Sequence, residues 1–405
     1  MKLKALTTVA VLAAATLIGV PAAPASADDA FYTPPAPLPA GSPGDIIKSQ
    51  PSRYDNSTAT RIMYLSRDAK DQPIPVTGTV FVPTKAWGGP GPRPVVAYAP
   101  FTAGMGDQCA PSKTLAGEGQ NDIVAIFQKG YIDRLLDKGI AVAQTDYEGL
   151  GTPGDHPYVM RLSEAHTVLD VLRAAKRLPA AGLPADGPAG IVGYSEGGGA
   201  SASAAELAST YAPELNIKGA YAGAPPADKA KLAKSLDGSL YAAFAGYSLI
   251  GIQTSYPEAD IPGLANDQGK KLFEEAAKTC TLDGMLKYMF MQTKSLTRDG
   301  RPIADYLDQA PFDKIVAENR IGTLKPAMPV EIQHSPFDDV IPQEIGKQLA
   351  KDWCAKGANV TFDGALIASP VFAHITGAVT APATAAAWMN DRFQDKPVTG
   401  NCGSF

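Results

Sequence analysis

The chain has 405 residues, of which 45% are hydrophobic and 19% charged, and its formal net charge is −5. This composition is typical of a globular protein with a sizeable core. An acidic chain without a basic patch is a poor candidate for nucleic-acid binding, so we exclude that class of function.

The first residues have the pattern of a secretory signal peptide. Lys2 and Lys4 precede an apolar run over 5–20, and Ala25-Ser26-Ala27 offers small residues for cleavage. A membrane anchor is the competing interpretation, but the run is short for a membrane span. We therefore predict cleavage after Ala27 and secretion. Because residues 1–27 contain two lysines and no acid, the mature chain of about 378 residues has a formal charge of −7.

The first half of the mature chain predicts antiparallel strands and then alternating strands and helices. The proline-rich segment 32–44 is too polar and too stiff for a helix, so we expect it to run extended over the surface. Ser163 is expected to cap the helix that Pro179 ends. The expected strands of this half are 60–65, 74–82, 95–99 and 140–145, and the expected helices are 122–138 and 163–178.

Strands and helices continue to alternate in the second half. An apolar strand over 189–192 precedes a helix over 197–207, and another strand follows at 217–222. Segments 328–333 and 359–362 predict the last strands. Such alternation with short loops indicates an α/β fold with a mostly parallel, doubly wound sheet.

Between residues 226 and 322 the strand pattern lapses and helical segments replace it. We predict an all-helical cap over the carboxyl edge of the sheet, where ligands bind in such folds. The predicted organisation is a signal peptide (1–27), a core in two parts (28–225 and 323–405) and the cap (226–322). The apolar segment 240–256 contains glycines and is short, so we expect a buried cap helix rather than a membrane span.

Gly193-Tyr194-Ser195-Glu196-Gly197 lies where a predicted strand turns into a predicted helix. This G-x-S-x-G context is that of a nucleophile elbow, in which small flanking residues allow a strained turn that exposes the serine hydroxyl. The alternative is a tight turn with a solvent-exposed serine. We predict that Ser195 is a nucleophile.

A serine nucleophile needs a histidine base and an acid that orients it, and in this fold they follow the serine in the order acid, histidine. His156 and His166 precede Ser195, and His334 precedes every plausible acid, which leaves His374 in a loop before a C-terminal helix. Asp338 is the preferred acid because D-x-x-[IV]-P is the usual spacing of an acid loop. Asp339 is the fallback, and His334 is expected to support the acid loop.

The tetrahedral intermediate also needs hydrogen-bond donors for its oxyanion. One is expected to be the backbone N–H of Glu196, and the other the N–H of Thr102 in the loop after strand 95–99, with Ala103 as the alternative. A carboxylate at position 196 would oppose the developing negative charge. We therefore expect the Glu196 side chain to point away, or to be protonated or paired.

Four cysteines, Cys109, Cys280, Cys354 and Cys402, lie in a chain with a secretion signal. Cysteines in an oxidising compartment predict two disulfides, for which three pairings are possible. Their spacing contains no C-x-x-C and therefore predicts no zinc site.

With these residues assembled, the chain resembles the secretory lipase family of the α/β-hydrolase superfamily. The resemblance covers nearly all of the mature sequence. The segment 146–154 is its most diagnostic part, because no general hydrolase rule requires it. The segments that carry it are FYTPP (31–35), GDQCAPS (106–112), DYEGLGTPG (146–154) with HPY (156–158), and GYSEGG (193–198). One departure is Pro100-Phe101, where the family more often has His-Gly.

The resemblance implies an α/β-hydrolase fold and hydrolysis of carboxylic esters, triacylglycerols included, under a helical lid. It carries a Ser-Asp-His triad onto Ser195, Asp338 and His374. It also implies a disulfide between Cys109 and Cys280, and with it one between Cys354 and Cys402. For Asp146 and Tyr147 we favour a structural role, in which they fix the loop that follows.

We therefore expect a secreted, monomeric lipase or esterase that forms an acyl-enzyme on Ser195. It needs no metal or cofactor, and its partners are a lipid or small ester and, transiently, a lipid–water interface. The alternatives are an esterase for cell-wall or polymeric esters, a serine peptidase, and a non-catalytic binding protein. An apolar cluster over 285–291 is expected either to pack against the core or to line an apolar substrate channel.

Overall fold

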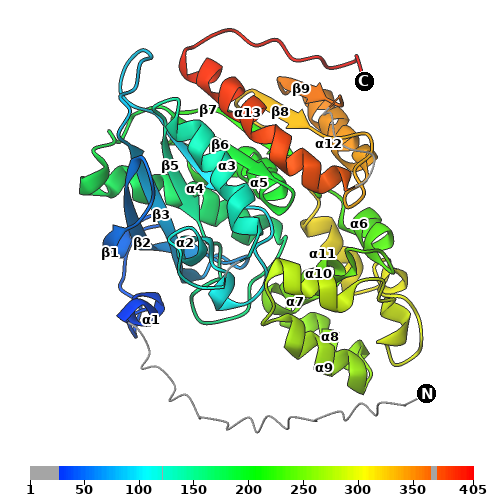
Figure 1. Ribbon diagram of the computed structural model, residues 1–405. Coiled ribbons are helices and arrows are strands. Elements are labelled where there is room, and N and C mark those ends of the chain that lie inside the picture. Colours follow the sequence, from blue (N-terminus) through cyan, green and yellow to red (C-terminus); the bar gives the residue numbers. More distant parts are fainter. Residues whose placement is uncertain (1–26, 121, 366–371) are drawn as a thin grey trace, which may run out of the picture.

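The computed structural model of the chain describes residues 27–120, 122–365 and 372–405 (Figure 1). The predicted signal peptide therefore lies outside the described residues, apart from Ala27. That residue begins helix α1 (Ala27–Tyr32). Residues 33–45 form no helix or strand and are mostly exposed, as the proline-rich composition predicts.

A nine-stranded sheet passes through the described part of the molecule in the order β1-β2-β3-β5-β4-β6-β7-β8-β9. The first four strands of that order pair antiparallel, and the strands from β5 to β9 pair in parallel. The strands are β1 (Ile46–Ser52), β2 (Ser57–Arg67), β3 (Pro73–Pro83), β4 (Val95–Ala99), β5 (Ala141–Thr145), β6 (Ala189–Tyr194), β7 (Ile217–Gly223), β8 (Val330–Gln333) and β9 (Val360–Asp363).

Helices cover both faces of the sheet, and strand β4 shows why. The side chains of β4 are apolar on both faces of the sheet. Val96 and Tyr98 pack with one helix layer, while Val95 and Ala97 pack with the other. Helices α3 and α13 form the first layer, and α4, α5 and α12 the second. The bounds are α3 (Val124–Leu136), α4 (Arg161–Arg177), α5 (Glu196–Tyr211), α12 (Gln343–Ala355) and α13 (Ala373–Phe393).

The helices between β7 and β8 gather at one end of the molecule, at the lower right of Figure 1. We call residues 226–322 the cap. Its helix α7 is largely buried against other cap elements, as we predicted for an apolar cap helix. Within the described part of the chain, every helix is too short or too polar to span a bilayer. The cap helices are α6 (Lys229–Leu236), α7 (Ala242–Ser255), α8 (Ile261–Leu264), α9 (Asp267–Ala276), α10 (Thr281–Tyr288) and α11 (Phe312–Glu318).

The prediction that Ser163 is the N-cap residue of helix α4 is wrong. The helix begins at Arg161, two residues earlier than expected, so Ser163 lies within its first turn. The Arg161 N–H donates to Asn319 Oδ1 at 2.9 Å, and the Ser163 hydroxyl donates to Glu148 Oε2 at 2.5 Å. The side chain of Asn319, from residues 226–322, thus accepts a hydrogen bond from a backbone N–H at the start of the helix. We had expected Ser163 to accept such a bond.

Strand β1 is an element that the sequence reasoning missed. It contains Pro51 and pairs only with β2, so it is an edge strand, where proline is tolerated. Its alternation of half-buried and exposed residues is weak. The other predicted strands agree with the structure to within three residues at each end.

Two disulfides join Cys109 to Cys280 and Cys354 to Cys402, which is the pairing that the family resemblance implies. The second disulfide attaches the C-terminal segment to α12. Asn401 reinforces that attachment by hydrogen bonds to both the N–H and the carbonyl oxygen of Phe362 in β9.

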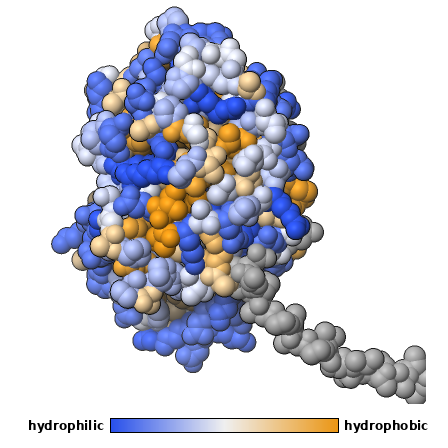
Figure 2. Space-filling view, turned by 90° about the vertical axis from the view of Figure 1, so that its left-hand side faces the viewer, coloured by the Kyte–Doolittle hydropathy of each residue, from blue (hydrophilic) through white to orange (hydrophobic). Residues whose placement is uncertain are grey.

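One face of the molecule is shown in Figure 2. Hydrophobic residues gather near the middle of this face, and hydrophilic residues surround them. Apolar surface gathered in one region is more informative than the same area scattered over a protein, because contiguous patches often mark contact sites.

Candidate active site

Ser195 lies in the turn between β6 and α5 with φ 58° and ψ −122°, a conformation that non-glycine residues rarely adopt. The turn requires glycine on both sides. A Cβ on Gly193 would lie 2.1 Å from the carbonyl oxygen of Gly197, and a Cβ on Gly197 would lie 2.0 Å from that of Ala99. These contacts explain why small residues flank the serine in this motif.

The three side chains that the sequence predicted as a triad lie in one hydrogen-bonded row. His374 Nε2 is 2.8 Å from Ser195 Oγ, and His374 Nδ1 is 2.8 Å from Asp338 Oδ2 and 3.0 Å from Oδ1. Asp338 follows β8, and His374 lies in the first turn of α13 rather than in the preceding loop. Residues 368–371 of that predicted loop, which spans 368–374, lie outside the described residues.

The acid loop explains the preference for Asp338 over its neighbour. Asp338 Oδ1 accepts from the N–H groups of Val340 and Ile341 at 3.0 and 2.8 Å, which is the turn that the D-x-x-I-P spacing encodes. Asp339 instead accepts the His374 backbone N–H at 2.9 Å and the Tyr241 hydroxyl at 2.8 Å. Asp339 therefore holds the backbone of the histidine and a cap residue, but it does not contact the imidazole ring.

His334 supports the acid loop, as we predicted. Its Nε2 donates to the carbonyl oxygen of Ile341 at 2.8 Å and lies 3.5 Å from Asp338 Oδ2. Burial acts to raise the pKa of Asp338, but the charge and hydrogen bonds of His374 and His334 outweigh it and hold that pKa well below its usual value. Asp338 is therefore an anion over the whole neutral range.

Thr102 follows β4 and lines a cavity together with Ser195 and His374, whereas Ala103 does not line it. The Thr102 hydroxyl is 2.8 Å from the Tyr158 hydroxyl, so it is already engaged. In the described residues the Thr102 N–H makes no hydrogen bond. The N–H of Glu196 is also free of a helical acceptor because Glu196 is the first residue of α5.

The Glu196 side chain is buried and paired, which agrees with our expectation for the carboxyl group next to Ser195. Its Oε1 is 2.8 Å from His156 Nε2, and His156 Nδ1 is 2.8 Å from the carbonyl oxygen of Glu148. A carbonyl oxygen can only accept, so Nδ1 carries a proton. Burial lowers the pKa of His156, which favours the neutral ring with Nε2 as acceptor.

A neutral His156 requires Glu196 to be the donor and hence a carboxylic acid. Burial raises the pKa of Glu196 to about 8, although Thr102, Glu164 and Lys229 act to lower it. Sequence reasoning identified neither His156 nor Glu164 as a partner. The only available signal was that a glutamate beside an oxyanion must be neutral or paired.

His156, Glu164 and Glu196 are also the one group in the described residues whose ligand atoms come close enough to hold a metal, all within 4.8 Å of one another. However, His156 and Glu196 are hydrogen-bonded to each other, and Glu164 accepts the Val159 N–H at 2.6 Å. We interpret the group as a hydrogen-bonded network behind Ser195.

The cavity at Ser195 has a volume of about 110 Å³ and is lined mainly by apolar side chains. Met285, from the apolar cluster predicted over 285–291, is one of them, while Tyr288 and Met291 line a separate cavity inside the cap. Leu286 and Phe290 are exposed. The cluster is therefore divided between the site, the cap interior and the surface. The cavity is lined by Phe101, Thr102, Ile123, Val124, Phe127, Tyr194, Ser195, Tyr241, Phe244, Thr281, Leu282, Met285, Val340, His374, Ile375 and Ala378.

Asp146 and Tyr147 have the structural role that we favoured, but chiefly for other segments than expected. Asp146 accepts the Ser112 N–H at 2.7 Å and the Thr77 hydroxyl at 2.7 Å. The Tyr147 hydroxyl donates to the carbonyl oxygen of Pro100 at 2.8 Å. Both residues thus stabilise the segments before and after Cys109, next to the site.

The sheet, the strained serine turn and the serine–histidine–aspartate row define an α/β-hydrolase. Residues 121–401 match the model of the secretory lipase family, and the chain belongs to that family of carboxylic ester hydrolases. A solved structure of Candida antarctica lipase A in its closed state is similar, with a TM-score of 0.82 and 26% identity over 93% of this chain and 88% of that chain.

Two relatives show how the family varies. A secreted triacylglycerol lipase of Malassezia globosa is 30% identical over 393 residues, which covers 94% of this chain and 84% of the relative. A protein of Mycobacterium tuberculosis named probable inactive lipase is 31% identical over 398 residues, which covers 92% of this chain and 83% of that protein. The relatives thus include a protein named as a triacylglycerol lipase and one named as probably inactive.

Proposed function

We propose that this protein is a secreted lipase that hydrolyses carboxylic esters of lipids, triacylglycerols included, through an acyl-enzyme on Ser195. His374 removes the proton from the Ser195 hydroxyl as its oxygen attacks the ester carbonyl, and Asp338 orients and stabilises the imidazolium that forms. The 2.8 Å contact between His374 Nε2 and Ser195 Oγ is the observation that supports this proposal most strongly.

The backbone N–H groups of Thr102 and Glu196 then stabilise the oxyanion. Collapse of the tetrahedral intermediate breaks the bond to the alcohol, which leaves with the proton that His374 returns. A water molecule, deprotonated by the same imidazole, attacks the acyl-enzyme and releases the carboxylic acid together with the free Ser195 hydroxyl.

The lining of the cavity supports an apolar acyl or alcohol group as substrate. Its described lining residues include no Asp, Glu, Lys or Arg. A peptidase that recognised a free amine would need an acid there, so the ester substrate is preferred. Hydrolysis of triolein, short-chain p-nitrophenyl esters and peptide anilides separates these possibilities, and we expect turnover of the two ester classes only.

The elements around the cavity also support contact with a lipid surface. Ile123 and Leu282 line the cavity and are 49% and 40% exposed. Ile126 on α3 and Leu286 on α10 are 67% and 59% exposed. Apolar side chains that continue from a site onto the surface favour a substrate that is itself an apolar phase.

A double variant tests that contact. We expect Ile126→Ser with Leu286→Ser to bind tributyrin emulsions more weakly than the wild type while it hydrolyses a dissolved short-chain ester at the wild-type rate. Equal binding to the emulsion would contradict the proposed contact.

We also propose that the protein acts as a monomer. Sedimentation of the purified protein tests this.

Turnover of a p-nitrophenyl ester by the wild type and by Ser195→Ala tests the function itself. Loss of the nucleophile of such a triad lowers kcat on the order of 10⁶-fold. Equal rates of the two proteins would remove the proposal, and so would a wild type without measurable turnover.

A further inference from the structure

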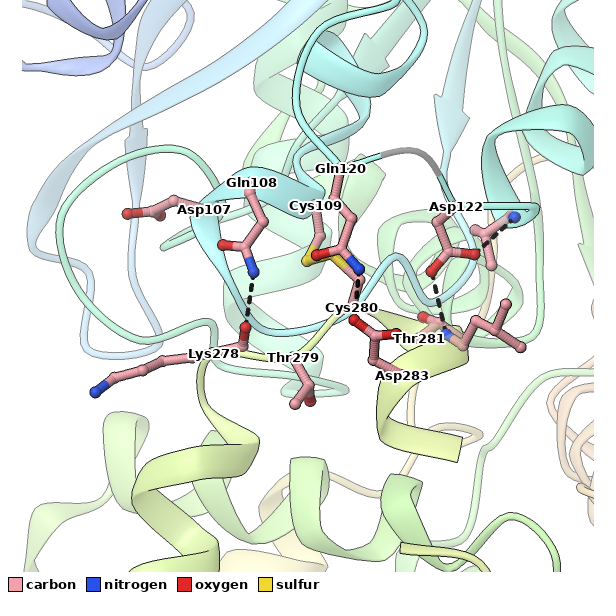
Figure 3. Close-up of a disulfide and its surroundings, with 12 residues drawn as sticks. Asp107, Gln108, Cys109, Gln120, Asp122, Lys278, Thr279, Cys280, Thr281 and Asp283 are labelled. Carbon is pink, nitrogen blue, oxygen red and sulfur yellow. Dashed lines mark hydrogen bonds between the residues drawn. A yellow bond between two sulfur atoms is a disulfide. The ribbon is translucent and has the colours of Figure 1, made fainter. Parts of the chain in front are cut away.

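The cap is attached directly to the loop that supplies the proposed oxyanion donor (Figure 3). We call Phe101–Cys109 the oxyanion loop. Gly104 of this loop pairs antiparallel with Cys280, at the start of α10. The Met105 N–H donates to the carbonyl oxygen of Thr279 at 2.9 Å, and the Thr281 N–H donates to that of Ala103 at 3.1 Å.

This pairing is close and is covalently fixed. A Cβ on Gly104, which has φ +126°, would lie 2.5 Å from both Cys280 Cα and the Thr279 carbonyl oxygen. The Cys109–Cys280 disulfide joins the same two segments. Figure 3 shows a further link beside it, in which Gln108 Nε2 donates to the carbonyl oxygen of Lys278 at 2.7 Å. The oxyanion loop and this part of the cap are therefore one structural unit.

Four consecutive carbonyl groups of the oxyanion region, from Pro100 to Ala103, all accept hydrogen bonds. The donors are the Tyr147 hydroxyl to Pro100 at 2.8 Å, Gln128 Nε2 to Phe101 at 3.2 Å, the Thr281 hydroxyl to Thr102 at 2.7 Å, and the Thr281 N–H to Ala103 at 3.1 Å. In a trans peptide the carbonyl and the N–H point in opposite directions. Held carbonyls therefore fix the direction of the N–H groups.

Thr102 is held on both sides by this arrangement. The Phe101 carbonyl belongs to the same peptide unit as the Thr102 N–H, so Gln128 orients that N–H directly. Thr281 holds the next peptide unit and prevents Thr102 from rotating about its own backbone. Thr281 is 6% exposed and lines the cavity at Ser195, but its hydroxyl is directed to a backbone oxygen.

We propose that Thr281 of the cap is a positioning residue for the oxyanion donor, with Gln128 as its counterpart on the core side. The cap then has a second role besides covering the site, because it aims the Thr102 N–H. A positioning residue of this kind improves binding of the transition state more than binding of the substrate. The inference rests on the proposed function of Ser195 and Thr102.

The test compares Thr281→Val with Thr281→Ser. Valine has the shape of threonine but no hydroxyl, whereas serine keeps the donor. We expect Thr281→Val to lower kcat about 10-fold to 100-fold with little change in KM, below the roughly 10²–10³-fold loss seen when an oxyanion donor itself is removed. Thr281→Ser should restore most of the rate, and Gln128→Leu should lower kcat in the same way.

Thr297→Val is the matched control. Thr297 is also in the cap and 7% exposed, and its hydroxyl donates to the carbonyl oxygen of Arg301 at 2.7 Å, away from the oxyanion loop. We expect wild-type kcat for Thr297→Val. A trifluoromethyl ketone, whose adduct with Ser195 carries an oxyanion, should bind Thr281→Val more weakly by the factor lost in kcat/KM.

The outcomes separate the two proposals. If the wild type turns over esters through Ser195 but Thr281→Val keeps its kcat and its ketone affinity, the positioning role is wrong and the proposed function stands. An equal loss in Thr281→Val and Thr297→Val would likewise overturn it, because the effect would be one of cap stability. If no Ser195-dependent turnover is found, the proposed function itself fails.

Discussion

The histidine side of the candidate site consists of side chains, whereas its oxyanion side consists of backbone groups. On the histidine side, three side chains from distant elements meet, and His374 and Asp338 are joined by hydrogen bonds of 2.8 and 3.0 Å. On the oxyanion side, the proposed donors are backbone N–H groups, and their positions depend on the side chains that hold the neighbouring carbonyl groups. Side-chain chemistry is encoded locally, whereas backbone direction is set by the tertiary structure around it.

This difference predicts the largest effects on the histidine side. We expect Asp338→Asn to lower kcat on the order of 10⁴-fold, because an amide cannot hold the imidazole in the required tautomer or stabilise its charge. Asp339→Asn is the matched variant one residue away. Because Asp339 contacts only the His374 backbone and Tyr241, it should cost far less. Measurement of kcat for both variants decides the assignment, and a larger loss in Asp339→Asn would reverse it.

The hydrogen-bonded network behind Ser195 predicts a pH effect on the oxyanion side. Burial raises the pKa of Glu196 to about 8, so its carboxyl is neutral below that pH and becomes an anion above it. An anion next to the oxyanion donors opposes the developing charge. We expect kcat/KM of the wild type to fall as pH rises above 8, and Glu196→Gln, which cannot ionise, to retain its rate there.

Glu331→Gln is the control for that profile. Burial raises the pKa of Glu331 to about 8 as well, but Glu331 lies on β8 and does not line the cavity. We expect kcat/KM of Glu331→Gln to fall above pH 8 as it does in the wild type. If Glu196→Gln shows the same fall as the wild type, Glu196 is not the group that titrates.

Glu196 also links stability to pH. The ordinary pKa of 4.5 is raised to about 8 in the folded state, so between these values the folded protein holds a proton that the unfolded chain has lost. The free energy of unfolding should therefore decrease as pH rises from about 4.5 to 8. In Glu196→Gln this contribution is absent, so chemical denaturation at pH 5 and pH 8 should give a smaller decrease than in the wild type.

Removal of each disulfide in turn is expected to have the smallest effects of these variants, and it compares the disulfide of the oxyanion loop with the one that attaches the C-terminal segment. They close loops with sequence separations of 171 and 48, so loop entropy predicts that loss of Cys109–Cys280 costs about 1 kcal/mol more in unfolding free energy than loss of Cys354–Cys402. Only the first joins the cap to the oxyanion loop. We expect the Cys109→Ala/Cys280→Ala protein to lose kcat and the Cys354→Ala/Cys402→Ala protein to keep it at temperatures where both are folded.

The same contrast explains what could be predicted from the sequence. The strained turn at Ser195 could be predicted because it requires Gly193 and Gly197, and the turn at Asp338 because it requires the D-x-x-I-P spacing. Strand β4 could be found because burial on both faces requires an unbroken apolar run. In each case the residues that a local conformation requires lie within the same short segment of the sequence.

Other features depend on partners far away in the chain. Thr281 contacts Thr102 across a sequence separation of 179, and His156 contacts Glu196 across 40. The start of α4 depends on Asn319, at a separation of 158 from Arg161. No local pattern marks these residues, because a threonine, a histidine or an asparagine at such positions has many ordinary structural uses.

Detection of the acyl-enzyme tests the central claim most directly. The wild type is mixed rapidly with a p-nitrophenyl ester, quenched with acid and analysed by mass spectrometry of its peptides. We predict an acyl group on the peptide that contains Ser195, formed in the burst phase, and none on Ser195→Ala. Steady turnover without an acyl group on that peptide, or an adduct that persists in Ser195→Ala, would contradict the account.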